Sequence, residues 1–499
     1  MDKPHSKNLN IILSVTVFVC GAAVMMVELI GSRLLAPYVG TSLIPWTTLI
    51  GVILASLSVG YWFGGRIADI RPSYIKLGFI ILLAGISVAI LLWLYLFLKD
   101  MAPLLASFNL GLAALFCSVF LFFIPSFLLG MITPYALRLA LTDLALAGKT
   151  AGSLYAYSTV GSIVGTFAAG FIFIPLWGSV RTLSTIAILL VVLSLFFFKT
   201  WLSKLLALVV VLNAVFIWSH LAIFYSSSKV MSDQESFYNR LFVVKDIEAK
   251  TNRPIISVMS GTHLSQSARF ADGSDDLVFP YTKFFRLVDY WLPTNQKVLM
   301  IGGGAYSVPR DYLQRNTKAT IDVAEIDPLY TSIAQQYFSL QPDQRLKIYH
   351  QDARIFLDKK TNSYDAIFVD AFNGSGSVPF HLATTEAVKK MKASLNNQGL
   401  VIVNLIGSLD GVGSNFINSE YATYAAVFDQ VKIFPLGNKS SDLQNVMLVA
   451  FKNIQWPNNL PNDSELAGFL TREDKQIKIN SRILTDDWAP VDYFLASIF

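Results

Sequence analysis

The chain has 499 residues, of which 54% are hydrophobic and 15% charged, and its formal net charge at pH 7 is +5. This composition excludes a single soluble domain, which would carry more charge and less apolar sequence. It gives no support for a nucleic-acid partner either, because the Lys and Arg residues form no basic runs. Only two cysteines occur, Cys20 and Cys117, so neither a disulfide framework nor a metal site is expected.

Long apolar stretches fill roughly the first 225 positions, whereas the rest reads as a soluble sequence. A helix needs about 20 mostly apolar residues to cross a bilayer. The sequence therefore predicts a membrane domain over residues 1–228 with about seven transmembrane helices. The expected spans lie at roughly 10–33, 43–64, 75–98, 108–135, 150–175, 181–198 and 205–225.

Small and ionisable residues inside these spans predict how the helices pack. The four-residue step from Gly161 to Gly165 lets helices approach closely, and Gly152 and Gly170 are interpreted in the same way. Glu28 and Arg33 lie in the first span, where a charge is costly. We expect them to be paired near an interface.

The charges of alternate loops predict an orientation. Lys99 and Arg181 lie on one side, and the larger set lies on the other: Lys3, Lys7, Arg66, Arg71, Lys76, Arg138, Lys149, Lys199 and Lys204. The positive-inside rule places the N-terminus in the cytoplasm. Seven crossings would then place the C-terminal part outside.

The soluble part begins with a β-hairpin region over residues 229–296. Short β-branched and aromatic runs at 237–250 and 254–270 predict a small antiparallel sheet, and a helix is expected at 281–292. From 297 to 499, strands alternate with helices, which predicts a doubly wound, Rossmann-like α/β domain. The expected strands are 297–301, 320–325, 346–349, 366–370, 400–405 and 446–451.

A glycine-rich turn follows the first of these strands, at Gly302, Gly303 and Gly304. Glycines let a ligand approach the backbone, and ligands of such sheets bind beyond the carboxyl ends of the strands. Glu325, at the end of the second strand, is suited to accept hydrogen bonds from two ribose hydroxyls. The turn lacks G-x-G-x-x-G spacing, so an adenosyl nucleoside fits better than a dinucleotide.

Two further acids follow neighbouring strands. Asp352 comes after the third strand, where a carboxylate can accept a hydrogen bond from an adenine amino group, and Asp370 ends the fourth. Three acids at strand ends, after a glycine turn, predict a ligand site.

These motifs resemble the polyamine aminopropyltransferases, the spermidine synthase family, whose catalytic domain has a methyltransferase-type fold. The matching stretches are Val298–Gly304, Ala324–Pro328, Gln351–Ala353 and Tyr364–Asp370. The chain is similar in particular to members in which several spans precede the synthase domain. The stretches that carry this second resemblance are Ser32–Tyr38, Tyr155–Ser162 and Leu484–Val491.

The resemblance implies transfer of an aminopropyl group from decarboxylated S-adenosylmethionine, as co-substrate, to an amine such as putrescine. No prosthetic group is implied. Asp370 would be the catalytic base. The nucleoside would be bound by the glycine turn, Glu325, Asp352, Gln266, Ala353 and Pro379, and the amine by Tyr281, Asn373, Asp486 and Asp487.

Two departures from the family pattern put putrescine in doubt. The family carries Asp where this chain has Ala305 and Asn373. Each charged hydrogen bond contributes about 1.5 to 3 kcal/mol, so a dication should bind more weakly. Asp486 and Asp487 are expected to restore acidity if they close over the pocket.

Two alternatives remain open: a methyltransferase, and a transporter whose soluble domain senses a nucleoside or polyamine. The expected location is the bacterial inner membrane, and a homodimer is one expected assembly. Because the donor is made in the cytoplasm, the catalytic domain is expected there, against the charge count. A re-entrant segment within residues 103–141, interrupted by Pro125 and Pro134, would reconcile the two.

Overall fold

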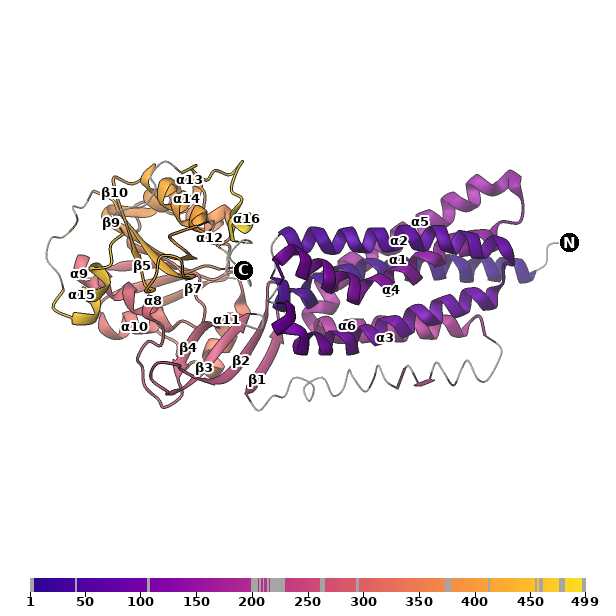
Figure 1. Ribbon diagram of the computed structural model, residues 1–499, viewed down its shortest axis with the longest axis horizontal. Helices are drawn as coiled ribbons and strands as arrows, with labels where there is room; N and C mark the ends of the chain where they lie inside the picture. The colour runs from indigo at the N-terminus through magenta and orange to yellow at the C-terminus, as the bar shows by residue number, and fades with distance from the viewer. Residues whose placement is uncertain are drawn as a thin grey trace. The chain divides into compact units, whose positions relative to one another are not determined.

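The computed structural model contains two compact units (Figure 1). Unit 1 comprises Met1–Ser228 with Glu235–Phe237, and unit 2 comprises Lys229–Gln234 with Tyr238–Phe499. The residues that the structure describes are 4–40, 43–105, 108–198, 229–260, 265–292, 296–372, 378–411, 413–453, 461–474 and 481–495, with single positions at 205, 208, 209, 211, 212, 215 and 456.

Unit 1 is a bundle of long helices. They are α1 (Pro4–Val39), α2 (Leu43–Ile70), α3 (Tyr74–Leu105), α4 (Leu110–Ala140), α5 (Ala147–Ala168), a π-helical segment (Ala169–Phe173) and α6 (Ile174–Leu195). Within the described residues, five helices are long and apolar enough to cross a bilayer, namely Leu9–Val39, Leu43–Ile70, Tyr74–Tyr95, Leu110–Ala140 and Leu144–Leu195. The protein is therefore a multi-pass membrane protein.

The last of these five helices is broken at Gly178, whose φ of 79° and ψ of 167° are not helical. The expected spans 150–175 and 181–198 lie on either side of this break. Helix α4 continues through both of its prolines, so the suspected re-entrant region contains one continuous helix. The expected span 205–225 lies mostly outside the described residues.

Two of the four small residues singled out in α5 and its extension form a close helix contact. A Cβ on Gly161 would lie 2.0 Å from the carbonyl oxygen of Phe18 in α1, and a Cβ on Gly165 would lie 2.5 Å from that of Ala22. A Cβ on Gly152 or Gly170 would meet no described residue within 4 Å. Among the described residues, the packing prediction is thus right for Gly161 and Gly165 and wrong for the other two.

Unit 2 opens with a four-stranded sheet in the order β1-β2-β3-β4. Its strands are β1 (Val230–Glu235), β2 (Arg240–Ile247), β3 (Pro254–Ser260) and β4 (Ser265–Phe270), and both β2–β3 and β3–β4 pair antiparallel. The helix expected at 281–292 is present as α8 (Pro280–Phe284), a 3-10 turn and α9 (Val288–Trp291).

The larger sheet has seven strands in the order β10-β11-β9-β8-β5-β6-β7. They are β5 (Lys297–Ile301), β6 (Thr320–Ala324), β7 (Leu346–Tyr349), β8 (Tyr364–Val369), β9 (Leu395–Gly407), β10 (Gln430–Pro435) and β11 (Gln444–Phe451). The five strands β5 to β9 pair in parallel, and β11 pairs antiparallel with both β9 and β10. The predicted α/β fold is confirmed, and β10 is a strand that the sequence analysis missed.

Helices cover both faces of this sheet. On one face, α10 (Ser307–Arg315) and α11 (Pro328–Tyr337) share a core with α8 and α9; on the other lie α12 (Ala353–Leu357), α13 (Thr385–Ser394) and α14 (Ser414–Ala425). Alternate residues of β5 point to the two cores, such as Met300 to the first and Leu299 to the second. Because β6 and β8 flank β5 on opposite sides, a ligand crevice is expected beyond the end of β5.

The glycine contact in unit 1 gives a stability prediction. We expect Gly161→Ala to lower the thermal stability of the detergent-solubilised protein, because α1 and α5 must move apart, at a cost of about 1 to 3 kcal/mol. Gly152→Ala in the same helix is the matched control, and it should leave stability unchanged or raise it, since Ala favours helix. Equal melting temperatures for the two variants would contradict the contact.

Candidate functional site

The turn between β5 and α10 brings backbone N–H groups to the end of the sheet. Gly302 has a φ of +85°, and a Cβ there would lie 2.3 Å from the carbonyl oxygen of Asp370. Gly304 has a φ of +50° and lies against Ser267 of β4. Both positions require glycine, for conformation and for space.

A buried carboxylate holds this turn in place. Glu325 Oε2 accepts hydrogen bonds from the N–H of Gly303 at 2.7 Å and of Gly304 at 3.3 Å, and Oε1 accepts one from the N–H of Asp327 at 2.9 Å. Burial raises the pKa of Glu325 to about 7, helped by the charge of Asp327 and opposed by the three N–H groups. Each oxygen keeps lone-pair capacity for a further donor.

The small sheet supplies a polar wall beside the turn. Ser267 Oγ accepts a hydrogen bond from the N–H of Ala305 at 3.1 Å, and Gln266 Nε2 donates to Ser260 Oγ at 2.9 Å. The Tyr281 hydroxyl donates to the carbonyl oxygen of Gln266 at 3.3 Å. The structure therefore brings Gln266 and Tyr281, named from the sequence, together with the glycine turn.

The acid after β7 caps a helix. Asp352 Oδ1 accepts hydrogen bonds from the N–H groups of Arg354 and Ile355 in α12, at 2.9 and 3.1 Å. Its Oδ2 lies 2.9 Å from Nε2 of His381. Asp352 thus has a structural role at the N-terminus of α12, where the buried Ala353 is the first helical residue, and both oxygens already have protein partners.

The acid after β8 is bound on one side only. Asp370 Oδ1 accepts a hydrogen bond from Asn404 Nδ2 of β9 at 2.9 Å. Within the described part of the chain, no residue donates to Oδ2. Burial raises the pKa of Asp370 to about 6, against the lowering effect of Asn404. The carboxylate is therefore mostly ionised at pH 7, with a free oxygen.

Two tyrosines lie near this carboxylate. Burial raises the pKa of Tyr281 and of Tyr330 in α11 well above the usual range, and the charge of Asp370 adds to both shifts. Tyr330 also forms a hydrogen bond with Ser260, which lowers its pKa, whereas the charge of Glu325 raises it. Both phenols therefore stay neutral at physiological pH.

The other predicted amine-binding residues differ in position. Asn373 lies outside the described residues. Asp486 accepts hydrogen bonds from Arg354 and from Thr384, both at 2.7 Å, and the Arg354 guanidinium lowers its pKa. Asp487 is exposed. Asp486 is therefore neutralised by a cation of the protein.

Pro379 and Ala305 are the remaining residues that the sequence analysis named. Pro379 precedes a short 3-10 turn (Phe380–Leu382) that carries His381, the partner of Asp352. Ala305 is fully buried in the turn. Because this residue is an alanine, the turn offers no carboxylate at this position.

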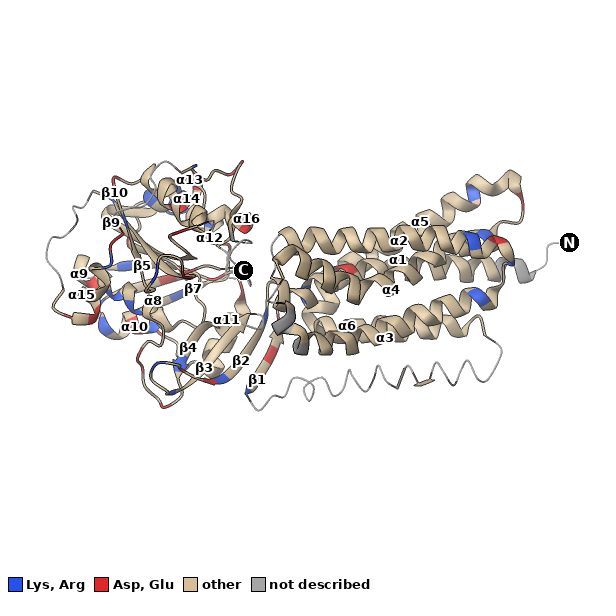
Figure 2. Ribbon diagram, in the orientation of Figure 1, with Lys and Arg blue, Asp and Glu red and all other residues tan. Residues whose placement is uncertain are grey.

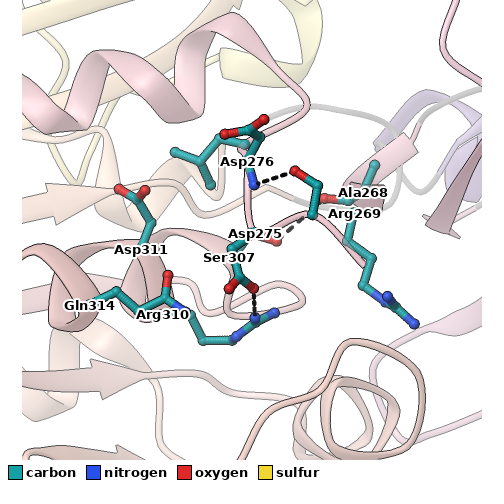
Figure 3. A pocket seen from close by; sticks show the side chains of 10 residues that line it. Ala268, Arg269, Asp275, Asp276, Ser307, Arg310, Asp311 and Gln314 are labelled. Carbon is teal, nitrogen blue, oxygen red and sulfur yellow. Dashed lines mark hydrogen bonds and ion pairs between the residues drawn. The ribbon is translucent and has the colours of Figure 1, made fainter. Parts of the chain in front are cut away.

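A small cavity lies elsewhere in unit 2, between the loop before α8 and helix α10 (Figure 3). Its volume of about 20 Å³ suits a water molecule, not a nucleoside. Its charged groups are paired, as Arg310 with Asp275 at 2.8 Å, so the cavity is not part of the candidate site.

Sequence reasoning missed Asn404 and Tyr330. Asn404 is 2% exposed inside an otherwise apolar strand, which is a signal that could have singled it out. Tyr330 is nearly buried in α11, and nothing in the pattern of that helix distinguishes it from a core tyrosine.

The chain is similar to proteins of known family. Residues 285–409 match the spermine/spermidine synthase domain. The chain is 28% identical over 219 residues to the polyamine aminopropyltransferase of Vibrio vulnificus, covering 43% of this chain and 70% of that protein. It is 23% identical over 411 residues to that of Leptospira interrogans, covering 78% of each. A probable spermidine synthase from Corynebacterium glutamicum superposes with a TM-score of 0.40 and 18% identity, over 54% of this chain and 93% of that structure.

The state of Glu325 gives a prediction for nucleoside binding. Ribose hydroxyls donate to the ionised carboxylate, so affinity for methylthioadenosine should rise as the pH is raised through about 7. Glu325→Gln should remove this rise and cost about 1 to 3 kcal/mol of binding, whereas the exposed Glu465→Gln should change nothing. Calorimetry from pH 6 to 8 measures this, and equal affinities for both variants would contradict the ribose assignment.

Proposed function

We propose that this chain, which belongs to the spermine/spermidine synthase family, is a membrane-bound enzyme that transfers an aminopropyl group from decarboxylated S-adenosylmethionine to an amine. The observation that carries the proposal is Asp370, a buried carboxylate at the end of β8 with one oxygen held by Asn404 and no donor to the other among the described residues. Its pKa of about 6 suits a base that works near neutral pH.

The proposed reaction is a single displacement. The lone pair of the amine attacks the aminopropyl carbon next to the sulfonium, so a C–N bond forms while the C–S bond breaks. The sulfur keeps the bonding electrons and leaves as methylthioadenosine, and the excess proton passes from the amine to Asp370. The sulfonium is a good leaving group, so the C–S bond needs no activation by the protein. Base catalysis, which typically raises a rate by about 10² to 10⁴, and the positioning of both substrates would supply the rate enhancement.

The donor would lie across the glycine turn. Glu325 would accept hydrogen bonds from the ribose hydroxyls while keeping its bonds to the turn. Asp352 would face the adenine amino group with the lone pairs not used by α12 and His381. Gln266 would contact the nucleoside and Tyr281 the amine, and the bond from the Tyr281 hydroxyl to the Gln266 carbonyl oxygen keeps these two residues together.

The acceptor site supports an amine with a single positive charge better than a diamine. Ala305 supplies no carboxylate, and Asp486 is already paired with Arg354. A far ammonium would therefore lose charged contacts worth about 1.5 to 3 kcal/mol each. Putrescine is expected to be a poor acceptor.

Two rival functions have different signatures. A methyltransferase would release S-adenosylhomocysteine and would not need a base at Asp370. A transporter would use Glu28 and Arg33, but Arg33 donates to the carbonyl oxygens of Ser236 and Phe237, both at 2.7 Å and all in unit 1. This pairing supports an anchoring role for Arg33.

The function is tested with the full-length protein, decarboxylated S-adenosylmethionine and a panel of amines. We expect release of methylthioadenosine. Asp370→Asn should lower turnover by roughly a hundredfold or more, because an amide cannot take the proton, while methylthioadenosine binds nearly as tightly as before. Asp365→Asn at the other end of β8 is the control. Equal losses of binding and turnover in Asp370→Asn would make Asp370 a nucleoside contact, not the base.

We further propose that the catalytic unit lies outside the cytoplasm, the face given by the charge count. Most Lys and Arg residues of unit 1 gather at one end of the bundle (Figure 2). There Asp69 of α2 pairs with Arg138 of α4 at 3.0 Å, and Lys76 donates to the Arg71 carbonyl oxygen. By the positive-inside rule this end is cytoplasmic.

Residues 235–237, the last residues of unit 1, lie at the opposite end of the bundle. Phe198, after α6, packs on Phe79 at the start of α3 with ring centroids 4.8 Å apart, whereas Tyr38 of α1 packs on Tyr95 near the far end of α3 at 6.0 Å. Phe79 and Tyr95 lie about 24 Å apart along α3. Arg33, close to Tyr38, holds Ser236, so Ser236 and Phe198 lie at opposite ends of α3. The donor would then have to be exported.

Cysteine labelling tests this orientation, because the two native cysteines are buried in helices of unit 1. Ala249→Cys in the β2–β3 turn and Ala145→Cys in the loop after α4 are matched exposed positions. A membrane-impermeant maleimide should label Ala249→Cys in intact spheroplasts and Ala145→Cys only after permeabilisation. The reverse pattern would place the catalytic unit in the cytoplasm.

A further inference from the structure

A buried asparagine lies behind the proposed base. Asn404 is 2% exposed in β9, between the buried residues Val403 and Leu405. Burying an amide is costly unless it is hydrogen-bonded, and an apolar residue of similar size would serve the sheet at least as well. The sheet itself therefore does not require an asparagine at this position. The hydrogen bonds that Asn404 makes give the reason for it.

The sheet register places this amide beside Asp370. Val369 of β8 pairs with Val403 of β9, so the next residues, Asp370 and Asn404, are neighbours where β8 ends and β9 continues. Asn404 Nδ2 donates to Asp370 Oδ1 at 2.9 Å, and Asn404 Oδ1 accepts from Asn445 Nδ2 of β11 at 2.9 Å. The bond from Asn445 fixes which end of the Asn404 amide faces the carboxylate.

We propose that Asn445 and Asn404 form a positioning relay that holds one oxygen of Asp370 and aims the other at the acceptor amine. The relay acts through Asp370 and touches neither substrate. It rests on the proposed function, because only a reaction that needs a base gives the free oxygen a task. The two asparagines are thus positioning residues, and Asp370 alone is the catalytic one.

The relay also sets the pH at which the base is ionised. Among the described residues, the groups that face Asp370 are Asn404 from β9, Tyr281 from α8 and Tyr330 from α11, and the two phenols are neutral in the working range. The Asn404 N–H lowers the pKa of a carboxylate that burial raises. Removing this donor must raise the pKa, so activity that requires the ionised form is lost at low pH and recovered at high pH.

The same two strands contain a matched control. At their other end, Asn396 of β9 donates to Asp365 of β8 at 2.7 Å. This pair has the same chemistry as Asn404 and Asp370 but lies about 17 Å away along β8. Asn396→Leu therefore removes an equivalent bond without touching the site.

The test is the pH profile of kcat/KM for the full-length enzyme, from pH 5.5 to 9, for Asn404→Leu, Asn404→Asp, Asn445→Leu and Asn396→Leu. We expect the acid limb of Asn404→Leu to move up by about one pH unit. Asn404→Asp should move it further, since it adds a like charge. Asn445→Leu should move it in the same direction by less, and Asn396→Leu should leave it in place.

A merely structural role predicts a different result. It would lower activity by the same factor at every pH, and Asn404→Leu would then resemble Asn396→Leu in profile even if both lose stability. That result would overturn the relay while leaving the transferase intact. If the wild-type enzyme releases no methylthioadenosine at any pH, the proposed function fails and the relay fails with it.

Discussion

The bond between the Glu325 carboxylate and the glycine turn is the interaction on which the rest of the site depends. Two turn N–H groups would otherwise point into a buried crevice without an acceptor, which is costly. Glu325 satisfies them from the end of the neighbouring strand and keeps lone pairs for a ligand. The turn is thereby held open, close to Asp370 on one side and Ser267 on the other. A single carboxylate thus links β5, β6 and the small sheet.

The acids at the strand ends differ because their surroundings differ. Glu325 is held by three backbone N–H groups, Asp352 is committed to a helix terminus and to His381, and Asp370 has one amide partner. Only the last keeps an oxygen free of protein donors among the described residues. Burial without full pairing is what raises the pKa of a carboxyl group toward neutrality and makes it a useful base. The different roles of the three acids therefore follow from their hydrogen bonds and not from the residue type.

Unit 1 satisfies its polar groups by means suited to a bilayer. Where α6 is broken at Gly178, the freed Ser179 N–H and hydroxyl both donate to Glu235 Oε2, at 3.0 and 2.8 Å. The Arg33 guanidinium donates to the backbone carbonyl oxygens of Ser236 and Phe237, the two residues after Glu235. Exposed backbone polar groups are costly in lipid, so a break in a helix requires such partners. Residues 235–237 therefore complete the bundle although they lie far from it in sequence.

The sequence by itself determined the elements whose signal is local. The spans follow from runs of apolar residues, and β5 has the bounds that its apolar run predicts, because a strand buried on both faces shows itself in composition. The glycine turn and its three acids were found because each lies at the end of a predicted strand. The small sheet before them was recognisable from β-branched and aromatic runs.

Only the tertiary structure decided what depends on partners distant in the chain. Asp486 was expected near the amine, yet Arg354, more than a hundred residues earlier, neutralises it. Asn404 became meaningful once the register of β8 and β9 set it beside Asp370. Gly161 and Gly152 look alike in sequence, but only the first meets another helix. In each case the deciding quantity is a distance between residues that local pattern does not encode, because packing and strand register fix it only when the whole sheet or bundle has formed.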